Sequence, residues 1–416
     1  MKRAELTRIL AFLCAVLLLT GCGATAPSDA KESEAPVTGQ EAVEQEPAEP
    51  SSAPEEEQGP YSADYELLWE ALETDYPYLD YLRGKGVDVD RIRESYAEQV
   101  RQAQNADEFA AILERMFLAM QNTAHLWVVS REDFPYFYSA YKEHIDPWRE
   151  TVEAAAQAGY YSLPTESGSP DESGIGYIPP VKVTWYADCS TLCITVRTFA
   201  HEAVERDRDV IWQAIAQYPD AENIVFDISN NSGGDTGYWM ANIVAPFGED
   251  QAFGLRMYYR DSPRNRLYVD AIVDAFFAES LPLEEVEAPA AWAEELGLDS
   301  VLVHDLPIPG EPKIQSNAKR WVIVNGVVYS SAEAFVCFCK STGWATVIGT
   351  QTGGDGVGFD PALLLLPNSG LLVRFSIVAG ESPGGGMNIE GTAPDVELKT
   401  GSIGYFLEYI RNERNK

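Results

Sequence analysis

The sequence predicts an α/β fold preceded by a helical subdomain, and three observations support this. Apolar residues recur at three- and four-residue spacing through residues 61–121, which is typical of amphipathic helices. Residues 223–228 form a short apolar run that opens into a loop of small polar residues and then into a helical segment at 238–245. Residues 321–324 and 332–340 repeat this order of buried strand, turn and helix. Strands alternating with helices indicate an α/β core.

The first 21 residues have the features of a secretory signal. Basic residues near the start are followed by an apolar segment at 9–19, which is too short for a stable membrane span. The segment ends in Leu19-Thr20-Gly21-Cys22, which resembles a bacterial lipobox. This resemblance implies cleavage before Cys22 and lipidation of its sulfur, so we expect a lipid-anchored protein on the extracytoplasmic face of the cell membrane. An uncleaved N-terminal anchor is the alternative and gives the same topology.

Residues 22–60 are predicted to form a disordered acidic tether. Beyond Cys22 this segment consists mostly of Ala, Pro, Ser, Glu and Thr and contains no aromatic residue, so it cannot bury enough surface to fold. The whole chain has a formal net charge of −35. This charge argues against nucleic acid or anionic lipid as a partner, and solubility outside the cell is the simplest explanation for it.

The rest of the chain is predicted to comprise a helical subdomain at residues 61–122 and an α/β domain at residues 123–416. Within the α/β domain we expect paired strands near 181–199, a helix near 202–217, and a hairpin formed by residues 362–366 and 370–378.

Residues 248–316 have the character of an insertion in the α/β domain. They are acidic and rich in alanine, with helical pieces near 269–278 and 289–296, and we expect them to form a lid or a wall of the substrate site. Residues 131–180 are aromatic and irregular, with a loop at 168–176, and they contain no motif that we can assign.

The cysteines do not indicate a metal or redox site. Cys14 leaves with the predicted signal, and Cys22 is the predicted lipid site. The other four, which we expect to be buried thiols, are Cys189, Cys193, Cys337 and Cys339. Their spacing does not match a zinc ligand set, and an exported location would permit a disulfide without specifying its connectivity.

Two serines lie where the apolar strand at 321–324 gives way to the helix at 332–340. A serine at such a corner is held rigidly, and the free N–H groups at the start of a helix favour a developing oxyanion. Ser330 and Ser331 are therefore candidates for acyl chemistry. The structural alternative is that they only cap the helix, since serine is common at helix starts.

A serine nucleophile needs a base and donors for the oxyanion. Of the four histidines, His125 alone stands at a helix-to-strand junction between apolar residues, whereas the others lie in charged or acidic surroundings. Gly233 and Gly234 follow a buried strand and offer a close backbone approach with N–H groups. A phosphate loop is disfavoured there, because no Gly-Lys-Ser/Thr follows. Glu390 is a carboxylate in a glycine-rich loop.

Four short segments, in this order, resemble the tail-specific or C-terminal processing serine peptidases, in particular the branch with the tricorn core and the interphotoreceptor retinoid-binding protein modules. The segments are the x-x-His-x-x-Val junction at His125, the Asp-Leu-Arg-x-Asn-x-Gly-Gly-like residues 227–234, the Ser-x-Ala-Glu of residues 330–333, and the Glu-Gly-x-x-Pro-Asp of residues 390–395. The resemblance implies a crotonase/ClpP-like spiral α/β core.

The same resemblance assigns roles to individual residues. It implies that Ser330 is the nucleophile, with Ser331 as the next candidate, and that His125 is the general base. Glu390 would orient the histidine. The backbone N–H of Ser331, with that of Gly233 or Gly234, would form the oxyanion hole.

The chain departs from the family pattern at several positions. Members with a Ser-Lys dyad carry lysine in the glycine-rich loop after the helix, where this chain has Asp355, so the histidine mechanism is favoured. The tricorn type has a serine just before the histidine, where this chain has Ala124. Ser229 and Asn230 replace the arginine-containing version of the Gly-Gly motif, and a PDZ-type module does not fit before the paired strands.

These observations predict an exported, lipid-anchored serine endopeptidase that hydrolyses peptides or unstructured protein segments through an acyl-enzyme. The alternative is a catalytically inactive protein of the same fold that binds peptide, lipid or cell-wall ligands. An acyl-CoA enzyme with the crotonase-type core is disfavoured by export. We expect no cofactor and no metal, since neither His-Glu-x-x-His nor a calcium-type carboxylate cluster occurs. The sequence does not specify an oligomeric state.

Overall fold

The computed structural model describes residues 59–163, 179–399 and 402–414 of the chain. The predicted signal at residues 1–21, the lipidation site Cys22 and the predicted loop at 168–176 lie outside the described residues, as does nearly all of the predicted tether. In the part that is described, none of the helices is long and apolar enough to cross a membrane.

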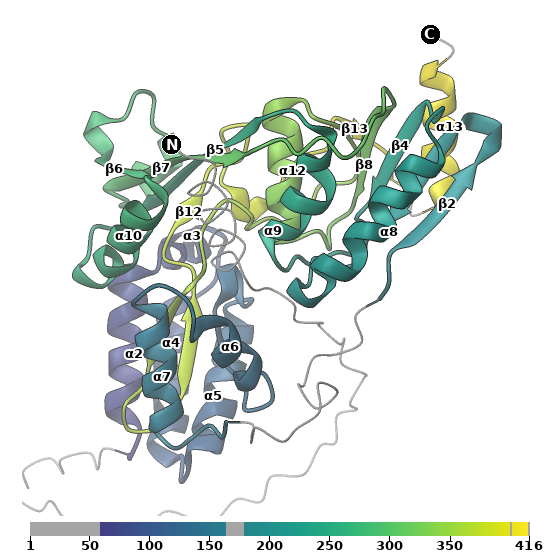
Figure 1. The fold of residues 1–416 in the computed structure, drawn as a ribbon. Coiled ribbons are helices and arrows are strands. Elements are labelled where there is room, and N and C mark those ends of the chain that lie inside the picture. Colours follow the sequence, from purple (N-terminus) through teal and green to yellow (C-terminus); the bar gives the residue numbers. More distant parts are fainter. Residues whose placement is uncertain (1–58, 164–178, 400–401, 415–416) are drawn as a thin grey trace, which may run out of the picture.

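Four helices at the start of the described chain lie together (purple and blue in Figure 1). They are α2 (Ser62–Asp75), α3 (Tyr78–Gly84), α4 (Val89–Gln102) and α5 (Ala106–Ala119). The side chains of Asp88 and Asn105 accept hydrogen bonds from first-turn amides of α4 and α5, which fixes where these helices begin. Leu72 and Phe109 are buried on their apolar faces. The predicted N-terminal helical subdomain is confirmed, while its boundary at residue 122 stays a prediction.

A small antiparallel sheet follows the helical subdomain. It has the order β1-β11-β10, with β1 (Trp127–Val128), β10 (Ala362–Leu365) and β11 (Leu372–Phe375). Strands β10 and β11 are the predicted hairpin, and only Leu126 lies between His125 and β1. The sheet therefore joins a segment near the start of the chain to one near its end.

The irregular structure expected for residues 131–180 is wrong where those residues are described. They form α6 (Phe134–Tyr141) and α7 (Trp148–Gln157) before the gap that begins at residue 164. Phe134, Phe137 and Tyr141 recur at helical spacing and are buried, so tertiary packing overrides the modest helix propensity of aromatic residues.

The main sheet has six strands in the order β13-β9-β8-β4-β3-β2. The strands are β2 (Lys182–Tyr186), β3 (Thr191–Thr195), β4 (Asn223–Asp227), β8 (Lys319–Val324), β9 (Thr346–Gly349) and β13 (Val396–Glu397). All neighbours are parallel except β2 and β3, which are antiparallel. Helices α8 (Val204–Gln217), α9 (Thr236–Trp239) and α12 (Ser331–Thr342) follow β3, β4 and β8 respectively. The predicted α/β class is confirmed.

Both faces of the main sheet are covered, which is the usual condition of parallel strands. Ile224 and Phe226 of β4 pack into the large core, which also contains residues of α8 and α12. Val225, which points to the opposite face, belongs to a second cluster with Phe406 and Ile410 of α13 (Ile403–Arg414). Figure 1 shows α13 (yellow) beside this sheet near the C-terminus.

The expected insertion at 248–316 contains two long strands that the sequence analysis missed. It forms β5 (Gln251–Tyr259), α10 (Pro263–Phe276), β6 (Glu279–Pro282), α11 (Ala291–Glu295) and β7 (Ser300–Ile308). With β12 (Ala379–Gly380) these strands make a sheet of order β12-β5-β7-β6. The helical pieces were expected, whereas the strands were not. In β5, the large apolar residues Phe253, Leu255 and Met257 alternate with Gly254 and Arg256, and this alternation is the sequence signal that could have indicated a strand.

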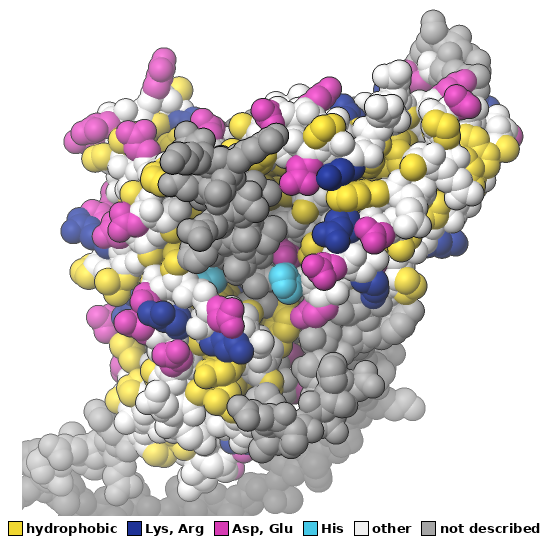
Figure 2. Space-filling model, viewed as in Figure 1, with side chains coloured by type: hydrophobic (Ala, Val, Ile, Leu, Met, Phe, Trp, Pro, Cys, Tyr) yellow, Lys and Arg dark blue, Asp and Glu magenta, His cyan; other side chains and the backbone are white. Residues whose placement is uncertain are grey.

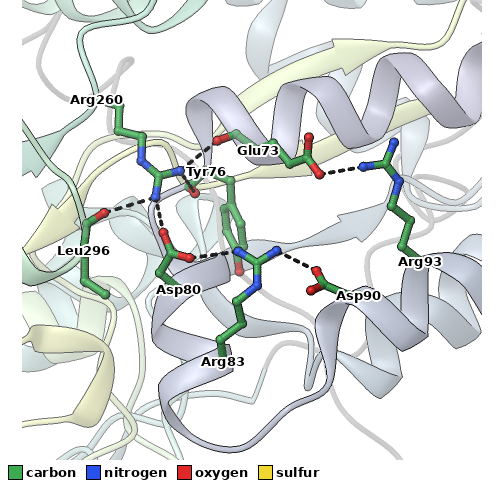
Figure 3. Close-up of polar contacts among 8 residues, drawn as sticks. All are labelled: Glu73, Tyr76, Asp80, Arg83, Asp90, Arg93, Arg260 and Leu296. Carbon is green, nitrogen blue, oxygen red and sulfur yellow. Dashed lines mark hydrogen bonds and ion pairs between the residues drawn. The ribbon is translucent and has the colours of Figure 1, made fainter.

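The insertion contacts the helical subdomain through Arg260 (Figure 3). Its guanidinium donates to the backbone oxygens of Glu73 at 3.0 Å and Tyr76 at 3.1 Å. It also donates to the Asp80 carboxylate at 2.9 Å and to the Leu296 oxygen at 3.1 Å. One side chain thus joins α2, the segment after it, and the insertion. On the face shown in Figure 2, acidic side chains are spread widely among smaller numbers of basic ones.

Candidate active site

Ser330 lies at the start of α12, which carries it at the edge of a small cavity. Its φ is 55°, a left-handed conformation that is uncommon for residues other than glycine. Its amide donates to the Gly354 oxygen at 2.9 Å, which fixes the turn. The Ser330 side chain makes no capping hydrogen bond with the helix. The alternative that Ser330 serves only as a helix cap is therefore not supported.

His125 ends a short 3₁₀ turn, η1 (Thr123–His125), and only Leu126 separates it from β1. Its Nδ1 lies 2.7 Å from Oδ2 of Asp355, and its side chain is 5 % exposed. Because an ionised carboxylate only accepts hydrogen bonds, Nδ1 carries the proton in this pair. The opposite nitrogen, Nε2, is buried and has no hydrogen-bond partner among the described residues. This arrangement leaves Nε2 as an unoccupied acceptor.

The ionisation states of His125 and Asp355 follow from the burial of both side chains and from the contact between them. Burial lowers the pKa of His125, although the adjacent Asp355 carboxylate partly opposes the change. Burial alone would raise the pKa of Asp355, but the contact with His125 and the hydrogen bond from Tyr329 hold it below its usual value. The Tyr329 hydroxyl donates to Asp355 Oδ2 at 2.5 Å. The geometry therefore favours a neutral imidazole beside an ionised carboxylate.

Ser330, His125 and Asp355 line one cavity of about 50 Å³. Of the four histidines in the chain, all of them described, only His125 lines it. His144 Nε2 lies 3.2 Å from Asp360, which lines the cavity, and His201 Nδ1 lies 2.8 Å from Asp235. His125 is thus the histidine that shares a cavity with Ser330, while its role as general base stays a prediction.

Two of the three residues expected to form the oxyanion hole line the cavity. Ser331 and Gly234 are among the lining residues, and Gly233 is not. The Gly233 amide instead donates to Oδ1 of Asn231 at 2.9 Å, so the inclusion of Gly233 is not supported. The Ser331 amide lies in the first turn of α12 and takes part in none of the hydrogen bonds among the described residues. Gly234 has a φ of 135° and is pressed against the Phe199 backbone, where a Cβ would have no room.

The expected role of Glu390 as the partner of His125 is not what the structure shows. The Glu390 carboxylate lies 2.5 Å from Nζ of Lys85, in an ion pair whose side chains are about half exposed. The carboxylate next to His125 is that of Asp355. The sequence analysis treated Asp355 only as the residue that replaces a lysine. Its position in the glycine-rich loop after the nucleophile's helix was the available signal.

The loop that carries Asp355 is held tightly against the start of α12. A Cβ at Gly356 would lie 2.3 Å from the Ala334 nitrogen and 2.5 Å from the Ser330 oxygen. Glycine therefore allows the loop to approach the helix closely enough to bring Asp355 to His125. Ser376 completes the surroundings, with its Oγ 3.4 Å from His125 Nδ1.

A second cavity, of about 40 Å³, adjoins the first and shares Gly358, Phe359 and Asp360 with it. Leu255 and Ile272 from the insertion also line it. This position agrees with the expectation that the insertion forms a wall of the substrate site, although the expectation itself stays a prediction.

None of the four described cysteines lines the cavity of Ser330. Cys189, Cys193, Cys337 and Cys339 are buried free thiols. Burial raises the pKa of Cys193 to about 12, so this thiol is not an activated nucleophile. Within residues 59–163, 179–399 and 402–414, no cluster of three His, Cys, Asp or Glu side chains is arranged to hold a metal ion.

Two families match the chain by sequence. Peptidase family S41 matches residues 190–398, and the tricorn protease C1 domain matches residues 60–118. No curated protein matches the chain.

Solved structures share the fold at low sequence identity. A candidate peptidase from Parabacteroides merdae is 19 % identical with a TM-score of 0.52, and the alignment covers 84 % of this chain and 93 % of that one. Mature CPAF is 12 % identical with a TM-score of 0.52, and the alignment covers 86 % of this chain and 98 % of that one. At these identities the likeness supports the fold alone.

Proposed function

The chain belongs to peptidase family S41, and we propose that it is a serine endopeptidase with Ser330 as nucleophile and His125 as general base. The observation that carries the proposal is the hydrogen bonding of the two nitrogens of the His125 imidazole. Asp355 holds Nδ1 at 2.7 Å, Nε2 is buried without a partner among the described residues, and His125 and Ser330 line the same cavity. A base oriented by a carboxylate beside a serine is the arrangement that acyl transfer requires.

The proposed reaction uses each of these groups in turn. His125 Nε2 takes the proton of Ser330 as Oγ attacks the peptide carbonyl carbon. The resulting oxyanion accepts a hydrogen bond from the Ser331 amide. The protonated His125 then gives its proton to the leaving nitrogen, the C–N bond breaks, and an acyl-enzyme remains. A water molecule, deprotonated by His125, hydrolyses the ester and restores Ser330.

Asp355 takes the role that the sequence analysis gave to Glu390. Its carboxylate fixes the tautomer with the proton on Nδ1 and stabilises the imidazolium that forms during the reaction. The presence of this carboxylate disfavours the alternative of a catalytically inactive binding protein. Asp355, which the sequence analysis treated as a departure from the family pattern, supplies the orienting group in this proposal.

The substrate class follows from family membership, since peptidases of family S41 act on peptides or proteins. Unstructured segments are the proposed targets, because an extended chain can enter a narrow cavity more readily than a folded domain. Export and attachment through a lipid on Cys22 also stay proposals, supported by the sequence at residues 1–22. Metabolic labelling with palmitate should mark the wild-type protein and fail to mark Cys22→Ala.

A serine-directed fluorophosphonate tests the proposed nucleophile. We expect stoichiometric labelling of the intact protein, with the adduct mapped to Ser330 by mass spectrometry, and no labelling of Ser330→Ala. Labelling that persists in Ser330→Ala but disappears in Ser331→Ala would reassign the nucleophile. A folded wild-type protein that resists the reagent and cleaves no unstructured substrate would contradict the proposed activity.

A further inference from the structure

A buried carboxylate beneath the nucleophile has no role in the mechanism given above. Glu333 follows Ser330 by three residues on α12 and is fully buried. Its Oε1 accepts hydrogen bonds from Thr392 Oγ1 at 2.5 Å and from Asn388 Nδ2 at 3.0 Å. Its other oxygen, Oε2, is buried without a hydrogen-bond partner among the described residues. Burying a carboxyl group in this way is costly, so its position calls for an explanation.

Asn388 connects this carboxyl group to the loop that carries Asp355. It lies in η8 (Asn388–Glu390) and is 1 % exposed. Its Oδ1 accepts from the amides of Gly356 at 2.6 Å and Val357 at 3.0 Å. Its backbone oxygen accepts from the Asp355 amide at 3.1 Å. Three consecutive amides of the loop therefore bond to this one residue.

The Asn388 side chain uses its full hydrogen-bonding capacity. Besides the bond to Glu333, its Nδ2 donates to Ser382 Oγ at 3.1 Å and makes a weaker contact with Cys337 Sγ at 3.4 Å. Two donors and two acceptor sites are all that an amide side chain offers. Reversing the amide would place a donor against the two loop amides and an acceptor against the Glu333 oxygen. Glu333 thus fixes the orientation of Asn388, and Asn388 fixes the loop.

We infer that Asn388, oriented by Glu333, is a positioning residue that holds Asp355 against His125. Through Glu333 it also fixes the position of the Asp355 loop relative to α12, the helix that begins after Ser330. The inference rests on the proposed function, since it assigns a role within that site. Displacement of a catalytic group by about 1 Å can cost on the order of 100-fold in rate. A link between the nucleophile's helix and the orienting carboxylate therefore has a direct effect on activity.

Exchanging the polarity of the Glu333–Asn388 hydrogen bond tests the inference. Asn388→Asp keeps an acceptor for the loop amides but places a carboxylate against that of Glu333. We expect the rate of Ser330 phosphonylation to fall on the order of 100-fold. Adding Glu333→Gln supplies an amide that donates to the new carboxylate, and we expect the double variant to recover to within about tenfold of wild type.

A second double-mutant cycle, between Asn388 and Asp355, distinguishes a positioning role of Asn388 from a general disturbance of the fold. If Asn388 acts through Asp355, Asn388→Asp should cost little further rate in a protein that already carries Asp355→Asn. Full additivity of the two losses would overturn the inference, as would a wild-type rate in Asn388→Asp alone. If Asn388→Asp does not fold, the Ser330 labelling rate of the Glu333→Gln/Asn388→Asp variant tests the inference. Recovery of its rate supports the inference, and a loss on the order of 100-fold or more in a folded protein contradicts it.

Asn368→Asp is the matched control. Asn368 Nδ2 donates to the buried Asp64 at 2.9 Å, so the variant also places a carboxylate against a carboxylate, in a turn away from the site. We expect its labelling rate to equal that of wild type. The labelling experiment distinguishes a failure of the proposed function from a failure of this inference. In the first case the wild-type protein itself is not labelled, and in the second it is labelled while Asn388→Asp behaves as wild type.

Discussion

At the scale of the residue, strained backbone gathers around the proposed catalytic groups. Ser330, His125 and Asp355 have φ values of 55°, 59° and 56°, and Ala124 has 52°. None of these residues is glycine, and such conformations persist only where the surroundings enforce them. The Ala124 oxygen accepts a hydrogen bond from the Ser376 amide at 2.9 Å, which helps to hold the turn before His125. The strain thus fixes the direction in which each functional side chain leaves the backbone.

The surroundings of His125 predict activity at mildly acidic pH. Burial lowers the pKa of His125, with Asp355 opposing the change, Arg374 adding to it and Asp360 opposing it at longer range. A general base must be neutral, so activity rises as pH increases through this pKa. Because that pKa lies below the usual value of about 6.5, the acid limb of kcat/KM should lie below that pH. A limb clearly above about pH 7 would contradict this assignment.

Sequence reasoning identified two of the three proposed catalytic groups. Ser330 and His125 carry local signals, namely a strand-to-helix corner and an apolar junction. Asp355 carries only a weak signal, its place in the glycine-rich loop after the nucleophile's helix, and Glu390 lies in a glycine-rich loop as well. The two acids differ in that the loop of Asp355 packs against the start of α12. This packing depends on contacts between segments far apart in the chain.

At the scale of the element, α12 and the loop of residues 352–357 act together. The loop crosses the first turn of the helix at a distance that only glycine allows, as the lack of space at Gly356 shows. The helix and its preceding strand were predictable, because a β-branched run and an uninterrupted apolar segment identify them. The close crossing was not predictable, since it depends on where the loop lies on the helix.

Gly356→Ala should impair both stability and activity. The added methyl group would meet the backbone of Ser330 and Ala334, so we expect a loss of about 1–3 kcal/mol in the free energy of unfolding. Slower Ser330 labelling should accompany this loss, because the loop must move away. Gly384→Ala is the control, since a methyl group added there would meet no other atom within 4 Å. Equal melting temperatures and labelling rates for the two variants would show that the crossing is not tight.

At the scale of the whole molecule, the site forms where separate parts of the fold meet. His125 comes from the junction between the helical subdomain and the small sheet, whereas Ser330 and Asp355 come from segments that follow strands of the main sheet. The insertion contacts the helical subdomain through Arg260. The α/β class and the helical subdomain were predictable from periodicity. The sheet of β12, β5, β7 and β6 was not, because three of its four strands lie within a segment that composition marked as helical.

Arg260→Met should destabilise the contact between the insertion and the helical subdomain. The Arg260 side chain is largely buried and donates to three backbone oxygens and to the Asp80 carboxylate. The variant removes the donor from all four acceptors, and only Asp80 keeps another cationic partner, Arg83. We expect a loss of about 2–3 kcal/mol, measured by denaturant unfolding. Arg266→Met is the control, because Arg266 pairs with Asp261 on the surface, and we expect no measurable change. Equal stability of the two variants would argue against a structural role for Arg260.

The assignment of Asp355 as the partner of His125 is tested most directly by comparing the Ser330 phosphonylation rates of Asp355→Asn and Glu390→Gln. Asp355→Asn should lose on the order of 10³–10⁴-fold, because an amide at this position no longer holds the productive tautomer. Glu390→Gln should react at the wild-type rate, since its carboxylate pairs with Lys85. A wild-type rate for Asp355→Asn together with a large loss for Glu390→Gln would contradict the proposed site.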